Sequence, residues 1–571
     1  MMSTRRAFGR WAAIAVVGWG QLAGAGCRED GSDDGAGTGT GVGTLGSMST
    51  GDETVGSMEV LYLQLSPAEQ VMEVDLGATA EQDFTVTAVF VDGSTADVTD
   101  MASFAVSNPE LGQMNGSILE VPARDESFFA SAIVSATIGD DTGQAQISLA
   151  TYDLENDFFF ILPFEDPAGE QTKPLTFSTE VKSMDVFVNM DTTFSMDGAV
   201  SNLQNAMAET IIPDIQDQVP DTQFGGGTFQ DFPTRGYGIP GSDQPFVLFQ
   251  TITDDVSDVQ NAVLDFMLGD GGDPPEAHYE ALYQIATGEG LDGPATTSVP
   301  PNDQGLGGVG FREGALPIVV SITNQGSHGI MGGPDNCPPY EGAVADVAHS
   351  REQALTALGG ICARVVQIAV ADPPDNDTAG CNALTDGTRL AEGTDAQIPP
   401  EAWEIDGRPP GCGAGECCTG LDGEGTSPNA AGLCPMVFQA DGGGGGVDTS
   451  FSNAIRLLAA YGRFGVTREI SGTAIDTGNT ADFIKAVVPA GHGSLPLPGV
   501  PEPTLGEESF DDVIPDTDVI FDVRALNDFV PQTAEPQVFV ATIHVLADDC
   551  GELDDRDVFI LVPPVELPAP G

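Results

Sequence analysis

The sequence predicts a multidomain protein that combines a β-sandwich with an α/β doubly wound, Rossmann-like domain set between β-rich flanks. The chain has 571 residues, which is too many for one hydrophobic core. Apolar residues alternate with polar ones from about residue 58 to 151, as in half-buried strands. From about residue 182, continuous apolar runs alternate with helical patterns, as in a parallel sheet covered on both faces.

The first segment, residues 1–26, has the features of an export signal. Three arginines precede an apolar stretch, residues 11–25, that is too short and glycine-rich to span a bilayer. Small residues then lead to Cys27, in a pattern that resembles a bacterial lipoprotein cleavage site. We expect Cys27 to be lipidated, and an ordinary signal peptide with an incidental cysteine is the alternative. The arginine pair also resembles a twin-arginine signal, so Sec and twin-arginine export both stay open.

Residues 27–57 are predicted to be a disordered acidic tether, because Gly, Ser, Thr, Asp and Glu leave almost nothing to bury. The formal charge of the whole chain is −68, with 87 Asp and Glu against 19 Lys and Arg. Such a field excludes nucleic acid and anionic membrane surfaces as partners. We therefore expect contact with a membrane through the lipid anchor only, on the bacterial outer membrane or cell surface.

The segment 58–151 is predicted to form the β-sandwich. Phe84, Val86, Ala88 and Phe90 alternate with less apolar residues, and a turn at Asp92-Gly93 follows. Together with Leu65-Ser-Pro67 and Val106-Ser-Asn-Pro109, this pattern resembles bacterial immunoglobulin-like group 2 domains. The resemblance implies an immunoglobulin-like fold that acts as a spacer.

The α/β domain is expected at 182–465. Its strands are read from apolar runs at 185–190, 246–250, 316–323 and 364–370. Its helices are read from periodic patterns at 200–212, 256–267, 276–286, 344–358 and 451–461. Residues 372–446, rich in Pro, Gly and Asp and holding five cysteines, are expected to be an insertion. The β-rich segments 152–181 and 466–571 are expected to form one flanking sandwich.

Eight cysteines remain after Cys27, and an even number in an oxidising compartment indicates disulfides. A thiolate metal site around residues 412–418 is disfavoured, because no histidine lies near it in the sequence. The connectivity of the pairs stays open. The candidates are Cys337, Cys362, Cys381, Cys412, Cys417, Cys418, Cys434 and Cys550.

The most informative motif follows the first apolar run of the α/β domain. Asp191, Thr193 and Ser195 stand at alternate positions between that predicted strand and a predicted helix. A strand that ends at the sheet edge delivers these three oxygen-bearing side chains into one loop. Hard oxygen ligands suit Mg²⁺ or Mn²⁺, or Ca²⁺ less strictly, and do not suit zinc. The motif therefore predicts a divalent-cation site.

Asp191-Thr-Thr193-Phe-Ser195 resembles the metal-ion-dependent adhesion site of von Willebrand factor A (vWA) domains, and more closely that of the integrin β I-like domain. The segments 225–233 and 269–276 resemble that family's second strand and its Asp-x-Pro-Glu loop. This resemblance implies that Glu276 completes the metal shell and that Asp273 helps to hold a second cation. Asn324 stands where the family has an aspartate, so the site loses one charge.

The resemblance implies a surface lipoprotein that binds a protein or glycan ligand, one offering a carboxylate, through the cation. The alternative is a structural envelope or scaffold protein whose vWA domain is metal-independent, with Asp191 capping the following helix. We do not expect an enzyme, because no nucleophile elbow or HExxH spacing is present. A hydrolase that used the same ion would need a general base beside it.

Overall fold

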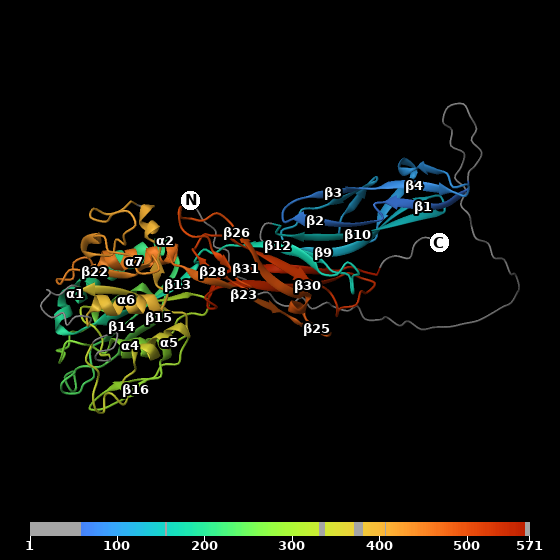
Figure 1. Ribbon diagram of the computed structural model, residues 1–571. Coiled ribbons are helices and arrows are strands. Elements are labelled where there is room, and N and C mark those ends of the chain that lie inside the picture. The colour runs from blue at the N-terminus through green and yellow to red at the C-terminus, as the bar shows by residue number, and fades with distance from the viewer. Residues whose placement is uncertain (1–58, 155–156, 330–336, 371–380, 406, 566–571) are drawn as a thin grey trace, which may run out of the picture.

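The computed structural model describes residues 59–154, 157–329, 337–370, 381–405 and 407–565. Three parts follow one another along an elongated molecule (Figure 1). The sheets of residues 59–152 form one end, a central group of sheets follows, and a mixed α/β part forms the other end. Cys27 and the tether lie outside the described residues.

The first part holds three small sheets around one core. The first sheet has the order β1(Val60–Ser66), β4(Thr85–Phe90), β5(Thr95–Asp97). The second has the order β2(Glu69–Asp75), β10(Asp141–Tyr152), β9(Phe128–Ile138), β6(Ser103–Val106). The third has the order β3(Ala80–Asp83), β8(Ile118–Val121), β7(Gln113–Asn115). Every second residue of β4 is buried, as the alternation of its sequence predicts.

The central part consists of two sheets. The larger has the order β11(Phe158–Ile161), β31(Gly551–Val562), β30(Gln537–Ala547), β23(Phe464–Gly472), β28(Phe510–Val513), β27(Thr504–Leu505). The smaller has the order β12(Gln171–Phe177), β29(Val519–Ala525), β26(Ile484–His492). Strands β11 and β12 precede the α/β part and their partners β31 and β29 follow it. The chain therefore leaves these sheets, builds the α/β part, and returns to them.

The α/β part is built on a six-stranded sheet. Its order is β15(Val247–Thr253), β14(Asp221–Phe229), β13(Ser183–Asp191), β18(Leu316–Thr323), β19(Arg364–Val370), β22(Val437–Ala440). All neighbours are parallel except β15, which runs antiparallel to β14 at one edge. The parallel strands are almost wholly buried, as expected for a sheet with helices on both faces.

Helices cover both faces of this sheet. One layer packs against Val186 and Val188 and contains α1(Asp197–Ala206), α2(Ile212–Gln218), α3(Val256–Leu264) and α7(Val447–Tyr461). The other packs against Phe187 and Val319 and contains α4(His278–Thr287), α5(Arg351–Gly359) and Leu390 of α6(Ala383–Gly393). Alternation along β13 sends Val186 and Phe187 to opposite layers. The remaining short strands are β16(Leu291–Asp292), β17(Ser298–Val299), β20(Gln397–Ile398), β21(Cys434–Pro435), β24(Ala474–Ile475) and β25(Gly478–Asn479).

Two expected helices differ from the structure. The helix expected at 200–212 is α1 followed by a π-helical turn, Met207–Ile211, and then α2. The helix expected at 344–358 begins only at Arg351, because the Ser350 side chain and Gln353 form a capping box there. The preceding residues 344–349 are irregular.

The stretch 372–446, expected to be an insertion, contributes to the sheet and to a helical layer. Its described residues include α6, which packs on β19, and β22, which pairs in parallel with β19 as the sixth strand. Between them, residues 394–405 and 407–436 form short strands, 3₁₀ turns and two disulfides. The high Pro, Gly and Cys content of this middle section concealed the regular elements at its ends.

The parts meet at two well-defined joints. Between the first and central parts, Phe129, Tyr152, Phe159 and Phe559 form an aromatic cluster with ring centroids 5.0–6.1 Å apart. Between the central and α/β parts, the disulfide Cys362–Cys550 and three ion pairs span the boundary. The ion pairs are Lys182–Asp554 at 2.7 Å, Arg364–Asp548 at 2.6 Å and Arg463–Asp512 at 2.6 Å.

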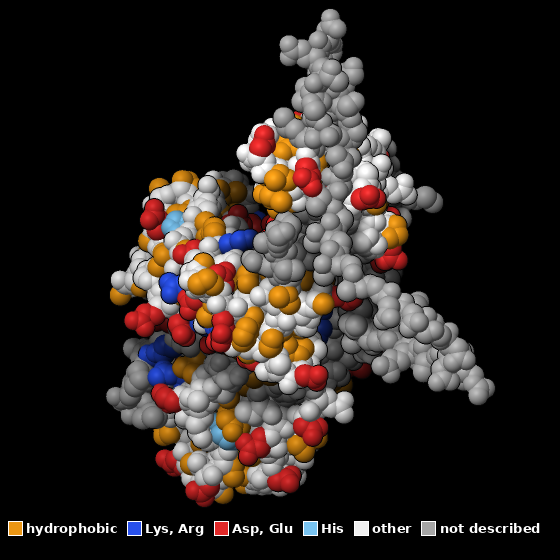
Figure 2. All heavy atoms as spheres, turned by 90° about the vertical axis from the view of Figure 1, so that its right-hand side faces the viewer, with side chains coloured by type: hydrophobic (Ala, Val, Ile, Leu, Met, Phe, Trp, Pro, Cys, Tyr) orange, Lys and Arg blue, Asp and Glu red, His pale blue; other side chains and the backbone are white. Residues whose placement is uncertain are grey.

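Acidic side chains are scattered over the face shown in Figure 2, and basic side chains are few. This distribution agrees with the formal charge of −68. Among the described residues, the helices are all too short or too polar to cross a lipid bilayer.

Candidate metal centre

Two neighbouring parallel strands end at the same edge of the α/β sheet. Strand β13 ends at Asp191, and β18 ends at Thr323, just before Asn324. The register pairs Met190 with Ile322, so Asp191 and Thr323 lie side by side. The Thr323 hydroxyl donates a hydrogen bond of 2.7 Å to Oδ2 of Asp191. This edge is where open α/β sheets place their ligands.

The loop after β13 folds back onto the Asp191 carboxylate. Oδ1 of Asp191 accepts hydrogen bonds from the backbone N–H and the hydroxyl of Thr193, at 2.8 and 2.7 Å. The Thr193 and Ser195 hydroxyl oxygens lie 3.4 Å apart, and Ser195 Oγ lies 3.3 Å from Oδ1 of Asn324. Four side chains predicted to be metal ligands therefore form one continuous group of oxygens.

Glu276 reaches this group from the loop between α3 and α4. Its backbone N–H donates to Gly326 O at 3.1 Å, and its carbonyl accepts from His328 N at 3.1 Å. Gly271 has no side chain, and the position that a Cβ would take there lies 3.5 Å from Cγ2 of Thr193 and 3.8 Å from Oε1 of Glu276. The side chains of Thr193 and Glu276 therefore border the same small space beside Gly271. Gly271 also has a φ of 67°, which favours glycine. The fifth predicted ligand thus faces the first loop.

The electrostatics of the group favour a cation. Burial raises the pKa of Glu276 well above its ordinary value, and the charges of Asp191 and Asp231 raise it further. Burial also raises the pKa of Asp191. In the described part of the chain, neither carboxylate has a Lys or Arg partner, and Oε2 of Glu276 is buried with no hydrogen-bond partner at all. A buried acceptor in this state costs about 1–3 kcal/mol.

These residues fit a divalent ion. Two carboxylates, two hydroxyls and an amide oxygen form a hard-oxygen set of the kind that Mg²⁺, Mn²⁺ and Ca²⁺ prefer. An ion bonded to Oε2 of Glu276 would satisfy that orphan oxygen and offset the repulsion between the carboxylates. No cysteine or histidine belongs to this set, so zinc is a poor match.

A second cluster, of two acids and a histidine, lies near Glu276, and its charges act on that carboxylate. Asp231, Asp273 and His328 each place one ligand atom within 4.8 Å of the others, and could hold a metal ion. His328 Nε2 lies 3.2 Å from Oδ2 of Asp231 and 3.7 Å from Oδ2 of Asp273. Tyr340 donates its hydroxyl to Oδ1 of Asp231 at 2.5 Å. The structure therefore places Asp273 in this cluster and not among the oxygens of the first loop.

The state of His328 follows from its contacts. Nδ1 lies 2.8 Å from the carbonyl of Pro338, which can only accept, so Nδ1 carries a proton. Burial alone lowers the pKa of His328, but hydrogen bonds to Asp231 and Asp273 and their charges outweigh this effect and raise it to about 9. At neutral pH the cluster therefore already contains one positive charge.

Sequence reasoning missed two members of the second cluster. Asp231 lies two residues after β14, at the same sheet edge as Asp191, and this position was the signal that could have identified it. The second is His328, which joins Asp231 and Asp273 from another loop. Histidines without a recognised spacing carry little information in a sequence.

The eight cysteines described by the structure form four disulfides. The pairs are Cys337–Cys381, Cys362–Cys550, Cys412–Cys418 and Cys417–Cys434. This confirms the expectation of disulfides and supplies the connectivity that the sequence left open. The adjacent residues Cys417 and Cys418 pair with different partners.

No protein-family model and no curated protein sequence matches the chain. Among solved structures, a von Willebrand factor type A protein from Catenulispora acidiphila is similar at 9% identity, over 82% of this chain and 75% of that chain, with a TM-score of 0.25. The pilus adhesin SpaC from Lactobacillus rhamnosus GG, in its open conformation, is similar at 11% identity over 70% of this chain, with a TM-score of 0.27. The match covers 48% of the adhesin, so this chain spans about half of it. Both likenesses are distant, and neither carries an argument about the site.

Proposed function

We propose that this chain is an exported, lipid-anchored surface protein that binds a protein or glycan partner through a divalent cation. The proposed ligands are Asp191, Thr193, Ser195, Glu276 and Asn324. The observation that carries the proposal is the Glu276 carboxylate, which is buried beside Thr193 with one oxygen lacking any partner. A side chain with this cost is retained more readily where a cation satisfies it.

The bound ion would supply a positive charge with an open coordination position for a carboxylate of the partner. Asp191 and Glu276 supply its negative ligands, and Asn324 contributes a neutral oxygen, which leaves the site less negative than three acids would. This explains how a chain with a formal charge of −68 could recognise an acidic group.

The rim of the site adds an apolar component. Phe194 stands between Thr193 and Ser195 and is 71% exposed, and Met267 is 77% exposed. Their loops are joined by a hydrogen bond of 2.7 Å from Gly269 N to Thr192 O. Exposed aromatic and Met side chains are enriched at binding surfaces. We propose that the partner presents an apolar group beside its carboxylate.

A second candidate function is structural, with a metal-independent site. It is favoured by the three hydrogen bonds that Asp191 receives from Thr193 and Thr323, which satisfy this carboxylate without an ion. In that case the α/β part would be a scaffold within the envelope. We propose no enzymatic role for either case.

Isothermal titration calorimetry with Mg²⁺, Mn²⁺ and Ca²⁺ tests the proposal. Wild type should bind at least one ion, and Asp191→Asn and Glu276→Gln should each lose most of the affinity. Asp254→Asn, which removes an exposed acid of the same α/β part, is the matched control and should bind as wild type does. Absence of binding by wild type would rule out the cation mechanism. Metal binding with no response to an acidic peptide would favour the structural function.

A further inference from the structure

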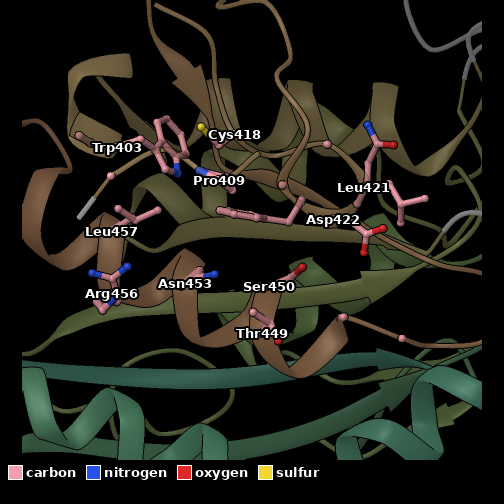
Figure 3. Close-up of a pocket in the computed structure, with 18 residues that line it drawn as sticks. Trp403, Pro409, Cys418, Leu421, Asp422, Thr449, Ser450, Asn453, Arg456 and Leu457 are labelled. Carbon is pink, nitrogen blue, oxygen red and sulfur yellow. The ribbon is translucent and has the colours of Figure 1, made fainter. Parts of the chain in front are cut away.

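A cavity of about 460 Å³ lies on the α/β part, between helix α7 and the disulfide-linked residues 407–423 with Ala402 and Trp403 (Figure 3). Its volume falls in the range of small-ligand pockets. Six residues of α7 and its N-cap, spaced by one, three or four positions, form one wall. They are Gly446, Thr449, Ser450, Asn453, Arg456 and Leu457. None of the residues proposed to bind the cation lines this cavity.

The opposite wall is held rigidly. The disulfides Cys412–Cys418 and Cys417–Cys434 close two short loops around it. Arg408 adds hydrogen bonds to the carbonyls of Pro400 and Glu416, both at 2.7 Å. A wall with this many cross-links loses little conformational entropy when a ligand binds. The cavity is therefore pre-formed.

The lining combines apolar surface with uncommitted polar groups. Figure 3 shows Trp403 and Leu457 toward one end and Asp422 toward the other, with Ser450 and Asn453 along the helix between them. In the described part of the chain, the side chains of Thr449, Ser450 and Asn453 make no hydrogen bond to protein. Hydroxyl and amide groups both donate and accept hydrogen bonds. They can thus pair with ligand groups that do the same.

This chemistry discriminates between ligand classes. A lipid or other wholly apolar ligand would remove water from the amide and hydroxyl groups without forming hydrogen bonds to them. Each group left in this state would cost about 1–3 kcal/mol of binding free energy. An anion such as phosphate is disfavoured, because Arg456 is already engaged in another interaction, Asp422 lines the other end of the cavity, and the chain is strongly negative. A neutral molecule with many hydroxyls satisfies both constraints, because its hydroxyls pair with the polar wall and its C–H groups contact the small part of Trp403, 8%, that is exposed.

We propose that this cavity is a saccharide-binding site, which accepts a short neutral glycan independently of the cation. The proposal goes beyond the function of the sheet edge, because the two sites share no residue. It gives the disulfide-linked residues 407–423 a role in ligand recognition as well as in the fold.

The chain offers a built-in reporter for this site. It has three tryptophans, Trp11, Trp19 and Trp403, of which only Trp403 lies among the described residues. Cleavage of the expected export signal, residues 1–26, removes Trp11 and Trp19, and in an uncleaved chain Trp11→Phe and Trp19→Phe remove their signal, so that the fluorescence reports on Trp403 alone. The probes are cellotriose, maltotriose, chitotriose and mannotriose, with inorganic phosphate and an Asp-containing hexapeptide as the competing classes.

At least one trisaccharide should change the Trp403 emission saturably, and the change should persist in EDTA. Asn453→Ala and Ser450→Ala should each weaken the apparent affinity by up to about tenfold, the loss expected for one hydrogen bond. Ser452→Ala, on the same helix but outside the lining, is the matched control and should leave the affinity unchanged. Thermal melts of all variants show whether each is folded, and saturation-transfer NMR on the same trisaccharides gives a second readout.

Four results would overturn the proposal. The first is that no trisaccharide changes the emission or the NMR signal up to ~10 mM, a concentration at which even weak complexes register. The second is a response to phosphate or to the peptide alone. The third is a saccharide response that Asn453→Ala and Ser450→Ala both leave intact, which would place binding elsewhere. Loss of the response in EDTA would assign it to the cation site.

Discussion

The Glu276 carboxylate and the Thr193 side chain border one small space beside Gly271, and the second oxygen of Glu276 is buried without a partner. The loop that carries Glu276 and the loop that carries Thr193 belong to separate parts of the chain, so this relationship exists only in the folded protein. It makes the stability of the α/β part sensitive to what fills that space.

Glu276→Gln should stabilise the metal-free protein and remove its response to metal. A neutral amide escapes repulsion by Asp191 and Asp231, so in EDTA the variant should gain about 1–3 kcal/mol in urea unfolding. With ion at 100 times its dissociation constant, wild type should gain about 2.7 kcal/mol and the variant should gain little. A variant that is less stable than wild type in EDTA would contradict this account.

Tyr340→Phe should weaken the second cluster. The Tyr340 hydroxyl donates to the buried carboxylate of Asp231 at 2.5 Å, and its loss should cost about 1–3 kcal/mol. Tyr283→Phe is the matched control, because its hydroxyl bonds Glu289 at 2.8 Å on an exposed surface. Urea denaturation of both variants in EDTA makes the comparison. If both variants lost the same free energy of unfolding, the hydrogen bond to Asp231 would contribute no more than an exposed one, which would contradict the prediction.

The disulfide Cys362–Cys550 should contribute more to stability than Cys412–Cys418. The first closes a sequence separation of 188 residues and the second only 6. Because a longer loop loses more entropy in the unfolded chain, replacing the first pair with Ala should cost about 2–4 kcal/mol, and the second should cost less. Thermal unfolding of the two double variants tests the order. The reverse order would mean that native packing around Cys412 dominates.

Asp157→Asn should stabilise the protein at neutral pH. Burial, followed by the charges of Asp557 and Asp153, raises the pKa of Asp157 to about 6. The unfolded pKa is lower, so the contribution of this group to stability is present in acid and is lost as pH rises through about 6. After allowance for its partial exposure, the variant should gain about 1 kcal/mol at pH 7 and nothing near pH 4. Asp254→Asn is the exposed control, and a gain independent of pH would contradict the assignment.

The sequence predicted the sheet edge better than the second cluster. Strand β13 and the run before Asn324 are continuous apolar stretches, and parallel strands bring such ends together, so Asp191 and Asn324 could be placed near each other. The prediction of Glu276 as a ligand depended on a family resemblance, because its loop has no periodic pattern that would place it. His328 reaches Asp231 only through tertiary packing, and no local pattern records that contact.

Errors in the elements have similar causes. The capping box from Ser350 to Gln353 was readable in the sequence, but apolar residues before it extended the expected helix. The strand β22 has four residues within a stretch rich in Gly and Cys, too short for its period to be recognised. Its place at the sheet edge is fixed by pairing with β19, which composition does not reveal.

The joint between the α/β part and the central sheets has a mechanical consequence. Three covalent links cross it: the chain entering β13, the chain leaving α7, and the disulfide Cys362–Cys550. All three lie at the amino ends of the parallel strands, while Asp191 lies at the carboxyl end. A pull exerted at the far end is therefore divided among three tethers in parallel, and rupture of any one leaves the load on the other two.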